Sequence, residues 1–266
     1  MRSKQNMCTI IEDRYNAIPV LFVKNNDLRI KPIVFLFHKL LNNKASELPL
    51  AHSLAKNGYF VVVLDMYGHG DRTESYEITG KYQFNYIFKD VYNTANDVWQ
   101  IINYLKELNE HSLDFNNIGA VGTSIGGSIA LVSSYLINEI KYAVSIVGTC
   151  NWEYILNNRT FDSFRFHAHS NPVMDYEKVR EYVKKRNPVN NYNSSNIKPI
   201  LFLNGMLDTT VPITIALEYF NQLKKVFSNY GEEDVLEFKT YSHAGHEVTP
   251  EMTRDLIEWL MNMGSK

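Results

Sequence analysis

One serine in the chain stands in a pattern that can make a hydroxyl group reactive. Ser124 is the central residue of a Gly-x-Ser-x-Gly pentapeptide, Gly122 to Gly126. A short apolar run, Ile118 to Val121, precedes the pentapeptide, and a segment typical of a buried helix, Ser128 to Leu136, follows it. This context predicts a nucleophile elbow, a sharp strand-to-helix turn that exposes one hydroxyl group. The pattern therefore indicates nucleophilic chemistry at Ser124.

Two later segments contain the partners that such a serine needs, a base and a carboxylate that orients it. Asp208 comes after the apolar run Leu201 to Asn204, and His246 lies in a glycine-containing loop after the last predicted strand. The order serine, acid, histidine is the order found in hydrolases with a nucleophile elbow. All three residues follow predicted strands, and the carboxyl ends of parallel strands meet at one edge of a sheet. We therefore predict Ser124 as nucleophile, Asp208 as acid and His246 as base.

Both partners have alternative interpretations. Asp208 could simply cap the turn before the helix predicted at Ile213 to Phe227. His243 competes with His246 for the role of base, and His246 is preferred because Gly245 lets the loop turn back over the sheet. A metal site at His243 and His246 would lack a third ligand and is not expected. The sequence contains no phosphate-binding glycine-rich loop and no paired Cys/His zinc spacing, so no cofactor is expected.

An acyl-transfer site also requires two backbone N–H groups that bind the negatively charged oxygen of the intermediate. The first is predicted at Ile125, directly after the nucleophile. The second is expected in the loop His38 to Lys44, which follows the predicted strand Pro32 to Phe37. The amide of Leu40 is the candidate in this loop.

The order of elements predicts an α/β protein with a mostly parallel, doubly wound sheet that helices cover on both faces. Apolar, β-branched runs of strand type alternate with amphipathic windows of helical type. The predicted strands are Pro32 to Phe37, Tyr59 to Asp65, Ile118 to Gly122, Tyr142 to Val147, Pro199 to Asn204 and Leu236 to Thr240. The predicted helices are Glu47 to Asn57, Asn85 to Leu108, Ser124 to Leu136, Ile213 to Phe227 and Thr249 to Met263.

One segment, residues 150–196, interrupts this alternation. It is rich in Asn, aromatic and charged residues, contains no strong strand and is too long for a plain loop. We predict an inserted small cap with a helix near Tyr176 to Lys185. Trp152, Phe161 and Phe164 are then candidate substrate-binding residues in an apolar pocket. The alternatives are a surface excursion without a role in binding and aromatic residues that only fill the core.

The composition is that of an ordinary soluble globular protein, with 266 residues, 45% of them hydrophobic, and a net charge of −2. It predicts a single domain over residues 1–266 and no electrostatic preference for nucleic acid or an anionic membrane. The first residues are polar without the apolar stretch of a signal peptide, and no run approaches a membrane span. Cys8 and Cys150 indicate reduced thiols. We expect a cytoplasmic protein with a small-molecule substrate, and the oligomeric state stays open, with a homodimer as one option.

Taken together, five motifs resemble those of the small serine esterases of the α/β-hydrolase superfamily. The most similar members are the bacterial dienelactone-hydrolase-like and prolyl-oligopeptidase-like carboxylesterases. His38 to Lys44 is similar to their His-Gly-Phe-Thr-x-x-Lys, and Asp65 to Gly70 matches Asp-x-x-Gly-His-Gly. Gly122 to Gly126 matches the elbow, Asn204 to Pro212 resembles His-Gly-x-x-Asp-x-x-Val-Pro, and Gly245 with His246 completes the set.

The resemblance extends over nearly the whole chain and implies an α/β-hydrolase fold. It also implies that Ser124, Asp208 and His246 are nucleophile, acid and base, with Leu40 and Ile125 as the oxyanion-binding donors. The implied function is a carboxylesterase that cleaves small acyl or aryl esters. The alternatives are a peptidase of the prolyl-oligopeptidase type and a non-catalytic binding protein on a hydrolase scaffold.

Two residues depart from the pattern of these esterases. Lys39 stands where the family has glycine, and Asn204 replaces a histidine at a strand end, which is expected to be neutral. A lysine at a backbone position with positive φ would be strained and would displace the second oxyanion donor. Alternatively, Lys39 tolerates the geometry and adds a positive charge near the site. His69 is expected to pack at the edge of the pocket.

Overall fold

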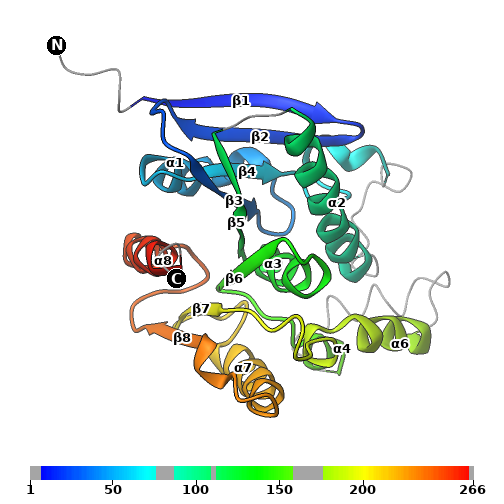
Figure 1. The fold of residues 1–266 in the computed structure, drawn as a ribbon. Coiled ribbons are helices and arrows are strands. Elements are labelled where there is room, and N and C mark those ends of the chain that lie inside the picture. Colours follow the sequence, from blue (N-terminus) through cyan, green and yellow to red (C-terminus); the bar gives the residue numbers. More distant parts are fainter. Residues whose placement is uncertain (1–6, 76–86, 109–111, 158–175, 264–266) are drawn as a thin grey trace.

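The computed structural model describes residues 7–75, 87–108, 112–157 and 176–263. Eight strands form one sheet in the order β1-β2-β4-β3-β5-β6-β7-β8 (Figure 1). Neighbouring strands from β4 to β8 in this order run parallel, whereas β1 and β2 pair antiparallel with each other and β2 with β4. The strand bounds are β1 Cys8–Tyr15, β2 Ile18–Asn25, β3 Lys31–Phe37, β4 Phe60–Leu64, β5 Leu113–Thr123, β6 Ile140–Ile146, β7 Ile200–Gly205 and β8 Leu236–Tyr241.

Helices cover both faces of the sheet, as the alternation of segments predicted. Their bounds are α1 Leu48–Lys56, α2 Ile87–Glu107, α3 Ile125–Leu136, α4 Trp152–Asn157, α6 Tyr176–Arg186, α7 Ile213–Ser228 and α8 Pro250–Met263. Short 3-10 helices lie at η2 Lys44–Glu47, η3 Gly70–Ser75, η7 Pro188–Asn190 and η8 Glu233–Val235.

The two faces of the sheet have separate hydrophobic cores. Because successive strand side chains point to opposite faces, neighbouring residues of β3 belong to different cores. Val34 packs in the core that contains Leu54 of α1 and Leu256 of α8. Phe35 packs in the larger core that contains Ile101 of α2 and residues of α3 and α7. These helices therefore form layers on opposite sides of the sheet.

The hairpin of β1 and β2 corrects the prediction that the first strand begins at Pro32. The two strands are joined by a tight turn in which Asn16 has a φ of 54°, a conformation that asparagine tolerates. β1 is an edge strand with many exposed residues, so its sequence lacks an apolar run. β2, by contrast, is almost entirely buried and carries an apolar pattern, so its omission was an error of interpretation.

The other predicted strands and helices are found within a few residues of their expected bounds. The short helix α4 was not predicted. In the segment proposed as a cap, the structure describes α4, α6 and η7, while residues 158–175 lie outside the described part. The cap itself stays a prediction.

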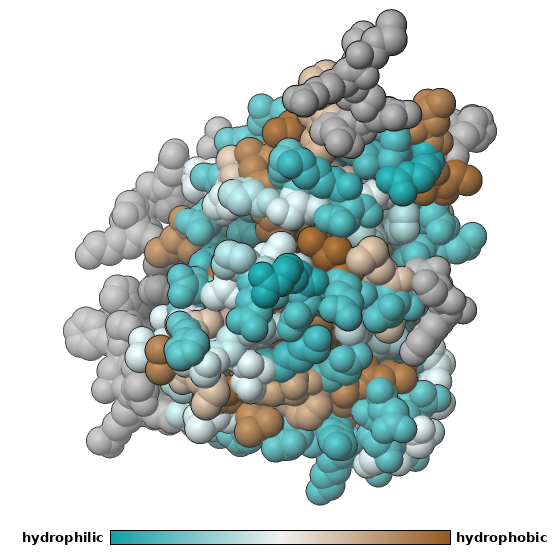
Figure 2. Space-filling view, turned by 90° about the vertical axis from the view of Figure 1, so that its left-hand side faces the viewer, coloured by the Kyte–Doolittle hydropathy of each residue, from teal (hydrophilic) through white to brown (hydrophobic). Residues whose placement is uncertain are grey.

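Hydrophilic side chains dominate the face of the molecule on which α1 and α8 lie, with hydrophobic residues scattered among them (Figure 2). None of the helices in the described ranges is both long and apolar enough to cross a membrane.

Candidate active site

Ser124 lies in a strained turn between β5 and α3. Its φ is 58° and its ψ is −121°, a combination that few residues other than glycine adopt. The turn is tightly packed, because a Cβ atom added to Gly122 would lie 2.0 Å from the carbonyl oxygen of Gly126. A Cβ atom added to Gly126 would lie 2.3 Å from the carbonyl oxygen of Phe37. The two glycines of the pentapeptide are therefore required by the close approach of α3 to the strands.

His246 connects Ser124 to Asp208 through two hydrogen bonds. Its Nε2 lies 2.9 Å from Ser124 Oγ, and its Nδ1 lies 2.8 Å from Asp208 Oδ2. Because the carboxylate accepts a hydrogen bond from the Nδ1–H group, the ring proton is on Nδ1, and Nε2 is the nitrogen that can accept the hydroxyl proton. A hydroxyl group in this arrangement can be activated for attack on a carbonyl carbon.

The carboxylate of Asp208 has a second role in the turn after β7. Its Oδ1 accepts hydrogen bonds from the backbone N–H groups of Thr210 and Val211, each at 2.8 Å. The side chain is almost completely buried. Asp208 therefore caps the turn with one oxygen and contacts His246 with the other, while its role as the catalytic acid stays a prediction. His243, the competing histidine, is exposed.

The predicted oxyanion donors lie beside the serine. Leu40 and Ile125 line the same cavity as Ser124. Ile125 is the first residue of α3, where an N–H group has no acceptor within the helix. Within the described ranges, neither backbone N–H group donates to another residue. Both donors are thus available for a ligand oxygen.

The buried side chain of His38 fixes the loop that carries Leu40. His38 Nε2 accepts a hydrogen bond from the backbone N–H of Met66 at 2.9 Å, so the ring proton is on Nδ1, which donates to Lys39 O at 2.7 Å. Burial lowers the pKa of His38 and favours this neutral form. The loop after β3 is thereby tied to the end of β4.

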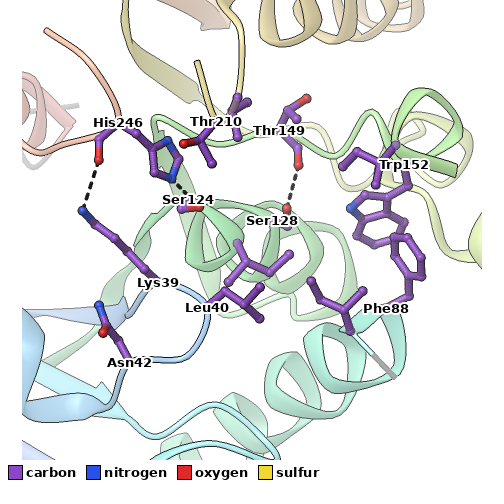
Figure 3. Close-up of a pocket in the computed structure, with 14 residues that line it drawn as sticks. Lys39, Leu40, Asn42, Phe88, Ser124, Ser128, Thr149, Trp152, Thr210 and His246 are labelled. Carbon is purple, nitrogen blue, oxygen red and sulfur yellow. Dashed lines mark hydrogen bonds between the residues drawn. The ribbon is translucent and has the colours of Figure 1, made fainter. Parts of the chain in front are cut away.

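Lys39 does not occupy the strained position that the sequence suggested. The residue with positive φ in this loop is Leu41, at 61°, two positions further along. Lys39 Nζ instead donates a hydrogen bond to the backbone oxygen of His246 at 3.3 Å (Figure 3). Of the two alternatives for Lys39, the structure supports a tolerated geometry with a positive charge beside the site.

Glu47 is a buried acid near the site that sequence reasoning missed. It is the last residue of η2, only 5% exposed, and it accepts a hydrogen bond from Thr123 Oγ1 at 3.5 Å. Burial raises the pKa of Glu47 to about 6, although the positive charge of Lys39 lowers it in part. The sequence contains no signal for this contact, because Glu47 and Thr123 come together only in the tertiary structure.

A cavity of about 280 Å³ opens beside Ser124. Trp152, predicted to bind substrate, is completely buried and packs against Phe88 with ring centroids 5.5 Å apart, so it forms part of the wall. Phe161 and Phe164 lie outside the described residues. The residues that line the cavity are Lys39, Leu40, Asn42, Ile87, Phe88, Ser124, Ile125, Ser128, Thr149, Trp152, Ile155, Thr210, Val211 and His246.

Several of these lining residues were not predicted, because they come from segments whose approach to Ser124 depends on the tertiary fold. Phe88 is in the first turn of α2, and Ile155 is in the unpredicted helix α4. His69, in contrast, is not among the lining residues. It is buried with its ring 5.8 Å from that of His38, and burial lowers its pKa to about 4.

The fold and the site together define an α/β-hydrolase, with an elbow after β5, an acid after β7 and a histidine after β8. Comparison with protein families gives the more specific assignment. The model of the prolyl oligopeptidase family matches residues 49–264, and the chain belongs to this family.

Individual proteins are similar to this chain over most of its length. The chain is 26% identical over 258 residues to "Putative esterase YitV" of Bacillus subtilis (strain 168), covering 95% of this chain and 98% of that protein. Among solved structures, TT1662 from Thermus thermophilus is similar with a TM-score of 0.69 at 17% identity, covering 96% and 98% of the two chains. The Pyrococcus furiosus esterase Pf2001 is similar with a TM-score of 0.64 at 20% identity, covering 97% and 94%. At these identities the structural likeness shows the fold.

Proposed function

We propose that the protein is a serine carboxylesterase that cleaves small acyl or aryl esters. The observation that carries this proposal is the continuous chain of hydrogen bonds from Ser124 through His246 to Asp208. In this proposal Ser124 attacks the ester carbonyl while His246 Nε2 accepts the hydroxyl proton. The same nitrogen then donates that proton to the departing alcohol.

The negative charge of the intermediate is stabilised by the backbone N–H groups of Leu40 and Ile125. Water then attacks the acyl group on Ser124 by the same route, with His246 again as base, and releases the acid. Asp208 orients the imidazole and stabilises its protonated form. The tie between His38 and Met66 supports the proposal because it holds the Leu40 loop in place.

The size and lining of the cavity favour short or medium acyl groups. Its volume of about 280 Å³ is near the lower end of the range of roughly 300–1,000 Å³ found for ligand pockets. Ile87, Phe88, Ile125 and Ile155 give it an apolar wall. As part of the same proposal, residues 150–196 form a cap within a single domain, and α4 contributes its residues to the acyl pocket.

Labelling with a fluorophosphonate probe and ester hydrolysis test this function. We expect wild type to be labelled and to cleave 4-nitrophenyl acetate and butyrate. Ser124→Ala should abolish labelling, and His246→Ala should lower kcat by about 10⁴-fold or more. Ser195→Ala, at an exposed serine, is the matched control. Absence of labelling in wild type, or equal labelling of Ser124→Ala, contradicts the proposal.

A peptidase is the second candidate, because the matching family is that of prolyl oligopeptidase. Aminoacyl 4-nitroanilides and 4-nitrophenyl esters release the same kind of chromophoric group and can be assayed in parallel. We expect ester cleavage to exceed amide cleavage. Amide cleavage without esterase activity would favour the peptidase instead.

A further inference from the structure

The two ends of the cavity beside Ser124 differ in chemistry. Lys39 and Asn42 lie at one end, on the side of His246, and Phe88 and Trp152 lie at the other, with Ser124 between them (Figure 3). Lys39 is the only lysine or arginine among the lining residues that the structure describes, and no aspartate or glutamate lines the cavity there. The site is therefore apolar on one side of the nucleophile and cationic on the other.

The ammonium group of Lys39 is only partly used by the protein. One of its three N–H groups donates to His246 O at 3.3 Å. No carboxylate in the described ranges forms an ion pair with it within 4.0 Å. Glu47 attracts Lys39 over a longer distance, but it is buried and does not line the cavity. The ammonium group thus keeps donors that a ligand can reach.

The position of His246 decides which part of an ester lies near Lys39. His246 Nε2 must protonate the departing oxygen, so the alcohol portion of the ester lies on the histidine side of Ser124. Lys39 is attached by a hydrogen bond to the backbone of that same histidine. The acyl portion then lies toward Phe88 and Trp152.

We propose that Lys39, at the same end of the cavity as Asn42, binds a carboxylate on the alcohol portion of the substrate. The preferred substrates are then esters of a small apolar acid with an alcohol or phenol that bears a carboxylate. This inference rests on the proposed esterase function and extends it by naming the substrate class.

Two esters with the same acyl group test the proposal, 3-butanoyloxybenzoate and its neutral analogue 3-butanoyloxybenzamide. We expect the ratio of their kcat/KM values on wild type to favour the carboxylate by about tenfold or more, the effect of one charge-assisted hydrogen bond. Lys39→Met should bring this ratio close to one, while Lys39→Arg should keep most of it. Lys56→Met changes the net charge equally at an exposed site and should leave the ratio as in wild type.

A second pair of esters places the carboxylate on the acyl portion instead of the alcohol portion. 4-Nitrophenyl hemisuccinate should be cleaved more slowly than 4-nitrophenyl butyrate, because its carboxylate must enter the apolar end. A faster reaction of the hemisuccinate would overturn the orientation. If wild type cleaves 3-butanoyloxybenzoate with a kcat/KM equal to or lower than that for 3-butanoyloxybenzamide, the proposed role of Lys39 is wrong.

Protection of Ser124 gives a measurement that needs no turnover. 3-Hydroxybenzoate should slow fluorophosphonate labelling at lower concentration than 3-hydroxybenzamide, and Lys39→Met should remove the difference. If wild type neither reacts with the probe nor cleaves any ester, the proposed function fails and this inference with it. If 4-nitrophenyl butyrate is cleaved but charge on the alcohol has no effect, only the inference fails.

Discussion

The imidazole of His38 joins two loops that are separate in sequence, because its Nε2 accepts a hydrogen bond from the backbone of Met66. The same ring holds the carbonyl of Lys39, next to the proposed oxyanion donor Leu40. We expect His38→Ala to lower kcat about 10- to 100-fold, less than or equal to the loss of one oxyanion donor. It should also cost about 1–3 kcal/mol of stability, since the Met66 N–H loses its partner.

Ester kinetics and urea unfolding measure the two effects of His38→Ala. His52→Ala, at an exposed histidine of α1, is the control and should change neither quantity. A stable variant with unchanged kcat would show that the loop after β3 keeps its position without this tie.

Substitution of Asp208 by asparagine separates its two roles. The amide oxygen can still accept from the backbone of Thr210 and Val211, but the amide nitrogen cannot accept from His246 Nδ1. We expect Asp208→Asn to lower kcat by about 10³- to 10⁴-fold, by analogy with the serine-protease example of this substitution. Asp208→Ala should in addition lower stability by about 1–2 kcal/mol, because the turn loses its cap.

Activity and thermal unfolding of the two Asp208 variants distinguish these contributions, with Asp234→Asn as an exposed control. Equal loss of stability in both variants would mean that the asparagine oxygen does not replace the carboxylate in the turn.

Glu47 makes the stability of the fold depend on pH. Its pKa is raised from 4.5 to about 6 by burial, so the folded state holds this proton more tightly than the unfolded state. The stabilisation is fully present below pH 4.5 and is lost as the pH rises through about 6. At 1.36 kcal/mol per pKa unit, the loss is about 2 kcal/mol.

The difference in unfolding free energy between wild type and Glu47→Gln isolates this effect, since other titrating groups are common to both. We expect the difference to change by about 2 kcal/mol between pH 4.5 and 7 in favour of the glutamine variant. Parallel pH profiles would contradict the burial of an ionisable carboxyl group at this position.

The stability of Gly122→Ala tests whether the turn at Ser124 requires a residue without a side chain. A Cβ atom there would lie 2.0 Å from the backbone of Gly126, so Gly122→Ala should cost more than about 3 kcal/mol. Gly231 has a positive φ, of 72°, which Gly122 does not have, but nothing lies within 4 Å of a Cβ atom added to Gly231. Gly231→Ala should therefore cost only about 1 kcal/mol, the strain of its backbone conformation. Chemical unfolding of both variants makes the comparison, and similar losses would contradict the packing argument.

The sequence predicted those features that depend on local pattern. The parallel strands have apolar runs, and Ser124, Asp208 and His246 follow strands in an order that the structure brings together. Features that depend on distant contacts could not be predicted in this way. Glu47 is in contact with Thr123 only because the fold brings the end of η2 to the end of β5, and Phe88 reaches the cavity only because α2 begins there. Lys39 was ambiguous for a different reason, since sequence alone does not show which residue of a loop takes positive φ.

The position of β8 at the edge of the sheet has a consequence for how the protein loses its activity. Among the strands that the structure describes, β8 pairs only with β7, and the loop after β8 carries His246. An edge strand can open locally without unfolding of the centre of the fold. We therefore expect a heated or aged sample to keep most of its helical circular-dichroism signal after displacement of His246, the proposed base, has removed its activity. We expect the lifetime of the activity in storage to depend on this outer strand more than on the stability of the whole molecule.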